Sequence, residues 1–343
     1  MRAWVRTQRG PARNTLKLAT DVPTPTVPTG LSSDVLIRVS HVALQSNSEL
    51  LMKTAPNLLF SSPWIPEIEL SGEIVAAGNG VPAEVREAGT KVVAFRSVPS
   101  LPMVLGHGVL AEYVRMPASQ VARVDATAVD IASASGVSCS GSAALKMIRR
   151  AGVREGHSVL VNGASGSVGS VLVQLCKLRG AKVAGVASGG NEEMVRGLGV
   201  DEFVDYKKHN LSEYLAQHYG DKPFDFVLDC VGVQDLFENS PAYLKPEGAV
   251  VNVGALQGIL SLAHNALFNT LLPTWLGGVP RRYITFGTPP ARDDNVYLIQ
   301  LMEEGRLRVP VDSIFDMEDA VSAYERIATK RARGKVLVKV GMD

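Results

Sequence analysis

The sequence is poor in cysteine. It contains three cysteines, Cys139, Cys176 and Cys230, which are far apart and odd in number. They predict no disulfide framework, and no C-x-x-C pair is present to hold a structural zinc ion. We therefore expect buried, reduced thiols, which is the usual state of free cysteine.

The chain also lacks an excess of charge and a long apolar run. Thirty-five Lys and Arg residues stand against 34 Asp and Glu residues, for a formal net charge of +1. No broad field is therefore available to hold a nucleic-acid backbone or an anionic membrane. No stretch approaches the ~18–20 uncharged apolar residues that span a bilayer, and no apolar run follows the N-terminus. We expect a cytoplasmic protein with a small-molecule substrate.

The length of 343 residues predicts two domains, at roughly 100–200 residues each. Residues 1–125 contain short segments of alternating apolar residues, bounded by Gly, Pro and Asn. This pattern is typical of a largely antiparallel β domain. The clearest of these segments are 34–44, 72–78, 90–95 and 110–116.

From Ala126 to about residue 288, strand and helix patterns alternate, which predicts a parallel sheet with crossover helices. The expected strands are mostly continuous apolar runs, as in a sheet covered on both faces. They are Ser158–Asn162, Lys182–Ala187, Glu202–Tyr206, Phe224–Asp229, Ala249–Val253 and Tyr283–Phe286. The helices expected at 295–304 and 318–327 and the strands at 313–315 and 335–340 would return to the first domain. Residues 126–288 would then be an insertion between 1–125 and 289–343.

The strongest motif is a glycine-rich turn between the first strand and helix of this second domain, Gly163-Ala164-Ser165-Gly166-Ser167-Val168-Gly169. Glycines permit a tight turn and close backbone approach, and the N–H groups that open the helix can bind a pyrophosphate. The strand before the turn and the strand after the helix are the context that this motif requires. We predict a Rossmann dinucleotide site at Gly163, Ser165, Gly166, Ser167, Val168 and Gly169.

The second strand of this domain indicates which dinucleotide binds. NAD sites usually carry Asp or Glu about 20 residues after the turn, but here the strand ends in Ser188-Gly189-Gly190-Asn191. A carboxylate would repel a 2′-phosphate, whereas the Ser188 hydroxyl and the Asn191 amide can bind one. We predict NADPH, with Tyr206 beside the adenosine phosphate. Lys207 and Lys208 are either phosphate contacts or a solvated loop.

These motifs resemble the zinc-independent quinone oxidoreductase and enoyl reductase branch of the medium-chain dehydrogenase/reductase superfamily, over essentially the whole chain. The matching stretches include SGEIVAAG, VLVNGASGSVG, FDFVLDCVG and LKPEGAVVNVGA. The sequence is also similar to fungal trans-acting enoyl reductases that serve polyketide pathways. The resemblance implies an α/β fold, with a doubly wound Rossmann sheet inserted in a GroES-like, largely antiparallel β catalytic domain.

The resemblance also implies roles for individual residues. Ser140 stands where the family usually has a threonine that faces the nicotinamide. Asn47 lies where many members have Asn-Pro, although Ser48 follows it here. The remaining implied cofactor contacts are Gly254, Ala255 and Leu256 after the fifth strand, and Lys335 near the C-terminus.

Zinc dehydrogenases of this superfamily need Cys and His ligands. The first catalytic Cys would stand in Val42–Ser48, and a Gly-His-Glu would stand in Ile65–Gly72. Neither segment contains Cys or His, and the first cysteine of the chain is Cys139. His41 and His107 have no partners at ligand spacing. We therefore expect no catalytic or structural metal.

Without a metal, the acceptor must itself be electrophilic, which favours an α,β-unsaturated carbonyl or a quinone. The enolate oxygen that forms needs a donor, and Gln45, Ser46 and Asn47 are candidates by position. Leu58, Leu59, Phe60 and Trp64 would form an apolar substrate wall or pack in the core. Reduction of a simple ketone or aldehyde, and a redox-neutral or partner-binding role for a biosynthetic enzyme, remain alternatives. The strand 283–286 leaves a homodimer and a monomer both open.

Overall fold

The computed structural model describes residues 1–46, 48–54, 64–97, 106–254, 258, 263, 265–287 and 289–341. The chain divides into two compact units, one of Met1–Ser142 with Pro289–Asp343 and one of Ala143–Thr288. The sequence pattern changes at residue 126, whereas the division of the structure falls inside helix α5, Val137–Ala151. Six residues named above lie outside the described part of the chain: Asn47, Leu58, Leu59, Phe60, Ala255 and Leu256.

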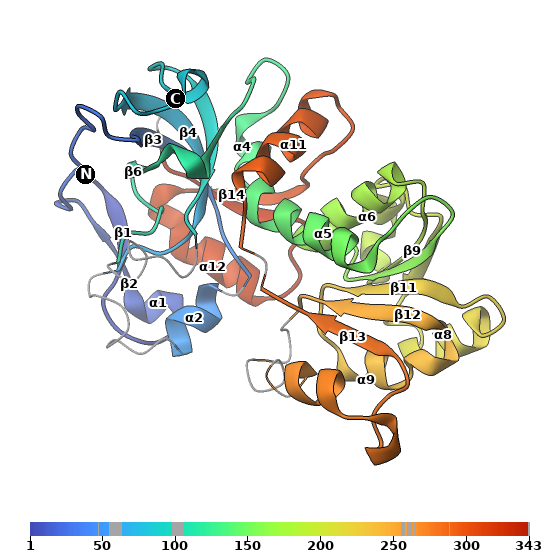
Figure 1. Ribbon diagram of the computed structural model, residues 1–343. Helices are drawn as coiled ribbons and strands as arrows, with labels where there is room; N and C mark the ends of the chain where they lie inside the picture. Colours follow the sequence, from blue (N-terminus) through green and yellow to red (C-terminus); the bar gives the residue numbers. More distant parts are fainter. Residues whose placement is uncertain are drawn as a thin grey trace. The chain divides into compact units, whose positions relative to one another are not determined.

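The first unit is built on a mostly antiparallel sheet (Figure 1). Its strand order within the described residues is β14-β15-β3-β4-β5-β7, with β6 paired to the other part of β3. Only the pair β14 and β15 is parallel among these. The strands are β3 Asp34–Ala43, β4 Glu69–Ala77, β5 Lys91–Phe95, β6 Tyr113–Pro117, β7 Val121–Arg123, β14 Val311–Asp316 and β15 Lys335–Lys339.

The C-terminal segment completes this sheet, as the sequence pattern predicts. Strand β15 pairs with β3 through Leu337 and Ala43, and Ala43, Leu337 and Ala132 pack in one buried cluster. A separate antiparallel pair is formed by β1 Ala3–Arg6 and β2 Leu16–Ala19. Besides the start of α5, the described α-helices of this unit are α1 Ala12–Thr15, α2 Ser48–Thr54, α4 Ile131–Ala134, α11 Arg292–Glu303 and α12 Ala320–Ala328.

The second unit contains a parallel sheet whose described strands follow the order β10-β9-β8-β11-β12-β13 (Figure 1). The order reverses between β8 and β11, which makes their carboxyl ends the switch point where ligands bind in open α/β sheets. The strands are β8 Ser158–Asn162, β9 Lys182–Ala187, β10 Glu202–Asp205, β11 Phe224–Asp229, β12 Leu244–Asn252 and β13 Arg282–Thr285.

Apolar side chains on this sheet pack beneath the crossover helices. Val227, Val250 and Tyr283 of the sheet and Phe237 of the helix at Gln234–Glu238 belong to one buried cluster. Each fully buried side chain of this size stabilises the fold by about 1.5–3 kcal/mol. The described α-helices of this unit are α6 Ser167–Leu178, α7 Glu192–Arg196, α8 Leu211–Tyr219 and α9 Gln234–Glu238, and a π-helix spans Asn265–Asn269.

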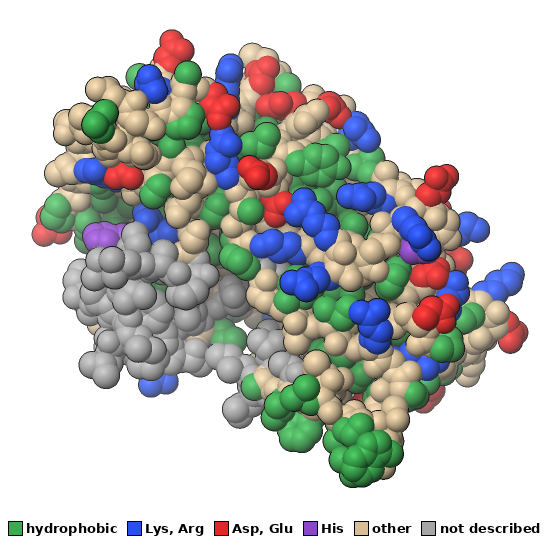
Figure 2. All heavy atoms as spheres, in the orientation of Figure 1, with side chains coloured by type: hydrophobic (Ala, Val, Ile, Leu, Met, Phe, Trp, Pro, Cys, Tyr) green, Lys and Arg blue, Asp and Glu red, His purple; other side chains and the backbone are tan. Residues whose placement is uncertain are grey.

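Exposed apolar side chains follow the π-helix (Figure 2). Trp275 is 80% exposed and Leu271 is 67% exposed. Within the described residues, no helix combines the length and the apolar character that a membrane crossing requires.

The predicted fold class is confirmed. The antiparallel sheet receives strands from both ends of the chain, and the parallel sheet lies between them in sequence. This is the arrangement of a Rossmann unit inserted in a β-rich unit.

Candidate functional site

The glycine-rich turn joins the carboxyl end of β8 to the first turn of α6. Gly163 has a φ of +82°, a left-handed conformation that favours glycine. Gly166 is the N-cap residue of α6 and provides no side-chain cap. The N–H groups of the first helical turn have no partner within the helix, so they are available to an anionic group at this end.

Each glycine of the turn meets a different steric limit. A Cβ at Gly169 would lie 2.1 Å from the carbonyl oxygen of Gly163, which is backbone and cannot move aside. A Cβ at Gly166 would lie 3.4 Å from the same oxygen, an ordinary contact. Gly169 is therefore required for helix packing against the turn, whereas a methyl group at Gly166 would fit without a clash.

Polar side chains end the strands on both sides of the switch point. Asn162, the last residue of β8, donates through Nδ2 to Oδ1 of Asp229, the last residue of β11, at 2.9 Å. Asp229 also accepts the backbone N–H groups of Val231, Gly232 and Val233. Burial raises the pKa of Asp229, and these donors oppose the rise. The network fixes the loop after β11 beside the glycine turn, where a Cβ at Gly163 would meet Val231.

The fifth strand of the parallel sheet has a similar end. Asn252 accepts the Gly254 N–H at 2.8 Å and donates to the Tyr283 hydroxyl at 2.8 Å. A Cβ at Gly254 would lie 2.1 Å from the carbonyl carbon of Val231. Gly254 is thus packed on the loop after β11, and the next three residues lie outside the described part of the chain.

The predicted 2′-phosphate residues gather at the ends of β9 and β10. The Asn191 amide donates to the Ser165 hydroxyl at 2.9 Å, so it links the second strand to the glycine turn. The Asn191 N–H donates to the Ser188 carbonyl at 2.8 Å and closes a short 3-10 helix, Gly189–Asn191. Tyr206 follows β10 and is 49% exposed.

Sequence reasoning missed a carboxylate at this position. Asp205 ends β10 in register with Ala187 of β9, and a Cβ at Gly189 would lie 2.4 Å from Asp205 Oδ2. The second strand carries no acid at its end, but the adjacent strand brings one to the backbone of Gly189. Parallel pairing of β9 and β10 was the available signal, since equivalent strand ends meet at one edge.

In the first unit, a buried polar cluster surrounds Gln45. The Gln45 Nε2 donates to Oε1 of Glu69 at 2.6 Å, and its backbone N–H donates to Oε2 of Glu67 at 3.1 Å. Ser140 lies on α5 and is 2% exposed. Its neighbour Cys139 donates its backbone N–H to Oε2 of Glu69 at 2.7 Å.

Lys335 lies in this cluster rather than at the surface. Its Nζ forms an ion pair with Glu69 Oε1, with exposed fractions of 2% and 0%. Burial and the Glu69 carboxylate raise the pKa of the Cys139 thiol, since both disfavour a thiolate. The cluster is therefore set to keep Cys139 protonated.

Glu67 is the second residue that the sequence pattern did not reveal. Its carboxyl accepts the Tyr324 hydroxyl at 2.7 Å and a hydrogen bond from the Ser48 side chain. Burial raises its pKa to about 7, and the hydrogen bonds oppose the rise. Glutamate just before a buried strand gives no sequence signal, because the residue is usually exposed.

No metal-ligand cluster is evident in the described ranges: no three His, Cys, Asp or Glu side chains lie close enough together to hold an ion. The sequence-based expectation of a metal-free protein stays a prediction. Trp64, one of the expected wall residues, is 3% exposed and packs in the core of the first unit, with the Arg6 guanidinium 5.4 Å from its ring centroid.

Comparison with known proteins gives two domain matches. Residues 32–126 match the alcohol dehydrogenase GroES-like domain, and residues 198–338 match the zinc-binding dehydrogenase domain. The chain is 45% identical to the medium chain reductase pydE of Acremonium sp, with 99% of each chain covered. It is 32% identical to the trans-enoyl reductase poxH of Penicillium oxalicum, covering 99% of this chain and 98% of the relative.

The solved structures agree with this likeness. The quinone oxidoreductase from Coxiella burnetii superposes with a TM-score of 0.80 at 26% identity, with 99% of each chain covered. Similarity thus extends over both units and is not limited to the dinucleotide-binding sheet.

Proposed function

Because the chain belongs to the medium-chain dehydrogenase/reductase superfamily, in its enoyl reductase and quinone oxidoreductase branch, we propose that it is an NADPH-dependent reductase of an activated double bond or a quinone. That it is an oxidoreductase of this superfamily follows from its relatives. The cofactor choice, the acceptor and a role in secondary metabolism are the proposal.

The observation that carries the proposal is the cradle at the switch point. Gly166 places no side chain over the turn, α6 begins without a side-chain cap, and Asn191 links the turn to the end of β9. These features fit a pyrophosphate at the turn. Ser188, Asn191 and Tyr206 would hold the 2′-phosphate against repulsion from the Asp205 carboxylate beside Gly189. Gly163, Ser165, Ser167, Val168, Gly169 and Gly254 would line the rest of the dinucleotide.

A bound NADPH would supply hydride, and the chain's own groups would stabilise the charge that develops on the acceptor. In the first unit, Gln45, Ser46 and Ser140 are the candidates among described residues, and Asn47 is a further candidate by sequence. A hydride acceptor without a Lewis acid must be electrophilic, so enones, enoyl thioesters and quinones are the proposed substrates. The trans-enoyl reductase relatives support an enoyl group, delivered free or by a biosynthetic partner enzyme.

The test is NADPH oxidation with a panel of enones, enoyl thioesters, quinones and simple ketones, with and without a chelator. Turnover of enones, enoyl thioesters or quinones that a chelator leaves unchanged is the expected result. Turnover of ketones alone would replace the proposal by carbonyl reduction. NADPH binding is measured separately as a rise in melting temperature, since a ligand that binds only the folded state stabilises it; no rise would refute the cofactor assignment.

A further inference from the structure

The backbone of Glu67 is in a conformation that glycine normally adopts. Its φ is +68°, in the left-handed region, where an L side chain is strained because its Cβ crowds the neighbouring carbonyl oxygen. Glu67 is only 4% exposed. Strain of this kind persists where the surrounding structure holds it, and such positions gather at functional sites.

The neighbouring backbone holds Glu67 in place from both sides. The Val109 N–H donates to the carbonyl oxygens of Pro66 and Glu67, at 3.0 and 3.1 Å. The Arg96 N–H donates to the Ile68 carbonyl at 2.6 Å. Three consecutive carbonyl groups are therefore anchored, and the side chain is aimed into the buried cluster rather than into solvent.

The carboxyl of Glu67 is surrounded by donors but has no direct ionic partner among the described residues. Three donors reach it: the Tyr324 hydroxyl, the Gln45 backbone N–H and the Ser48 side chain. The Lys335 ammonium acts on it only over a distance, because it is paired with Glu69. The remaining titratable group of the cluster is the Cys139 thiol, whose pKa is raised.

We propose that Glu67 is the proton source of the catalytic unit: its carboxyl stores the proton that completes the reduction and passes it on through the Ser48 hydroxyl. This rests on the proposed function. A buried carboxyl whose pKa lies near neutral pH suits the role, since an acid works best when its pKa is close to the working pH. Burial raises the pKa of Glu67 to about 7, so the carboxyl can hold a proton at neutral pH and release it to an enolate.

The proposed step is a proton transfer without change of oxidation state. The O–H bond of the Glu67 carboxylic acid breaks as its proton moves to the Ser48 oxygen, while the Ser48 proton forms the new C–H bond at the α-carbon of the enolate. Glu67 is left as a carboxylate, stabilised by Tyr324 and the Gln45 N–H. Water restores its proton after the product leaves.

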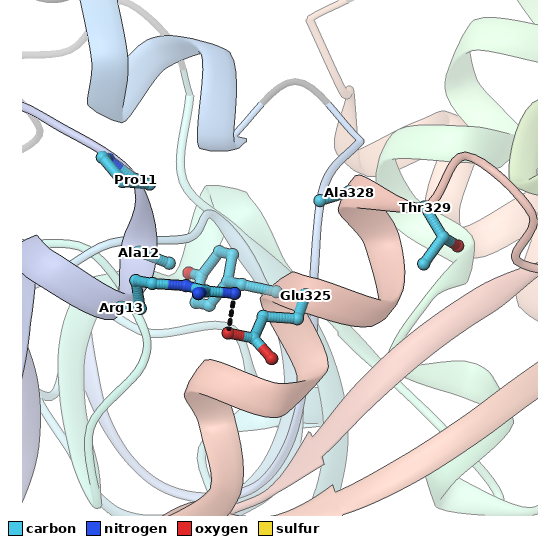
Figure 3. Close-up of a pocket in the computed structure, with 7 residues that line it drawn as sticks. Pro11, Ala12, Arg13, Glu325, Ala328 and Thr329 are labelled. Carbon is cyan, nitrogen blue, oxygen red and sulfur yellow. Dashed lines mark ion pairs between the residues drawn. The ribbon is translucent and has the colours of Figure 1, made fainter.

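A cavity of about 560 Å³ lies beside α1 and α12 (Figure 3). The cavity is lined by α1 and α12, where Arg13 and Glu325 form an ion pair at 2.8 Å. Tyr324 lines it too, yet is 1% exposed, and its hydroxyl donates to Glu67. A change of Tyr324 to Phe keeps the ring and removes only the hydroxyl that donates to the carboxyl.

The first measurement follows the carboxyl itself. Infrared difference spectra of the NADPH-bound protein are recorded across neutral pH for the wild type and for Glu67→Gln. A carboxylic C=O stretching band that titrates near pH 7 in the wild type and is missing in Glu67→Gln is expected. No titrating band, or one that persists in the variant, overturns the inference.

The second measurement is the single-turnover rate against pH, with the best substrate of the panel. The wild-type rate should fall as pH rises through about 7, because the acid form is lost. Glu67→Gln should lose this fall of the rate with rising pH, which we call the limb of the pH profile. Its rate should be about 100-fold or more below that of the wild type, with NADPH binding retained. Tyr324→Phe should move the limb to higher pH, since loss of a donor to the carboxylate raises the pKa of Glu67.

Glu325→Gln is the matched control, because it removes an exposed carboxyl that is next to Tyr324 on α12. This variant should keep the wild-type fall of the rate with rising pH. Glu67→Gln with the wild-type rate and limb overturns the inference while the proposed function stands. A wild type that binds NADPH but reduces nothing in the panel refutes the proposed function, and the infrared titration still decides whether Glu67 stores a proton. If Glu67→Gln does not fold, Tyr324→Phe decides, and an unmoved limb overturns the inference.

Discussion

The ammonium of Lys335 on β15 forms an ion pair with the carboxylate of Glu69 on β4, inside the first unit and 266 residues away in sequence. Glu69 also accepts the Gln45 side-chain amide and the Cys139 N–H. The carboxylate of Glu69 therefore links its own strand β4 to the C-terminal strand β15, to the loop after β3 and to helix α5. Resemblance to the family implies that Lys335 contacts the cofactor, which stays a prediction.

Removal of Lys335 leaves the Glu69 carboxylate buried without a cation. We expect Lys335→Met to lower the free energy of unfolding by about 3–5 kcal/mol, measured by urea denaturation. The double variant Lys335→Met/Glu69→Gln should regain most of the loss, because no buried charge remains. A loss below about 1 kcal/mol in the single variant, at the level of an exposed pair, would contradict this account.

Gly169 and Gly166 provide a matched pair in the glycine turn. Gly169→Ala should cost about 1–3 kcal/mol of stability, since its Cβ meets the Gly163 carbonyl oxygen, and should weaken NADPH binding at least tenfold through displacement of the turn. Gly166→Ala should cost little stability, because its Cβ lies at an ordinary contact distance. Thermal unfolding and NADPH titration check both, and equal stability losses would refute the steric argument.

The pKa of Glu67 also predicts how stability depends on pH. Its pKa is raised to about 7 in the folded protein from about 4.3 in the unfolded chain. The protonated Glu67 carboxyl adds to the free energy of unfolding, and this contribution is fully present below about pH 4. It is lost as pH rises through the folded pKa, because the unfolded chain releases this proton first. The wild type should lose about 3 kcal/mol of unfolding free energy through this group between pH 4 and pH 8. Glu67→Gln has no carboxyl to titrate and should not show this loss. Urea denaturation across this range tests the difference, and a constant difference would contradict it.

Cofactor preference depends on charge at the ends of β9 and β10. Ser188→Asp places a carboxylate where the 2′-phosphate is proposed to bind, so NADPH affinity should fall at least tenfold, about 1.4 kcal/mol, with NADH affinity retained. Asp205→Asn removes the carboxylate beside Gly189 and should strengthen NADPH binding. Fluorescence titration with both nucleotides checks these shifts. Unchanged NADPH affinity in Ser188→Asp would place the 2′-phosphate elsewhere.

Much of the fold was predictable because its signals are local. The run Ser158–Asn162 and the following turn occur where the pattern places them, since continuous apolar residues and glycines act within a few positions. Strand ends were less certain: β12 begins at Leu244 rather than Ala249 and contains Pro246. Its start pairs with Phe224 across an irregular register, a partner that no local pattern identifies.

The candidate site divides in the same way. The glycine turn could be predicted from spacing, because it lies within one strand–turn–helix unit. The roles of Ser188 and Tyr206 stay predictions. The approach of Asp205 to Gly189 could not be predicted from spacing, because it depends on the pairing of two strands.

The sequence by itself determined the parallel sheet, its glycine turn and the return of the C-terminal strands, because periodicity and turn chemistry are properties of short segments. Only the tertiary structure decided what surrounds Glu67 and Glu69. Their donors come from α2, α5, α12, β15 and the loop after β3, and burial raises the pKa of Glu67. Desolvation and long-range hydrogen bonds exist only once these elements pack together, so no run of residues encodes them locally.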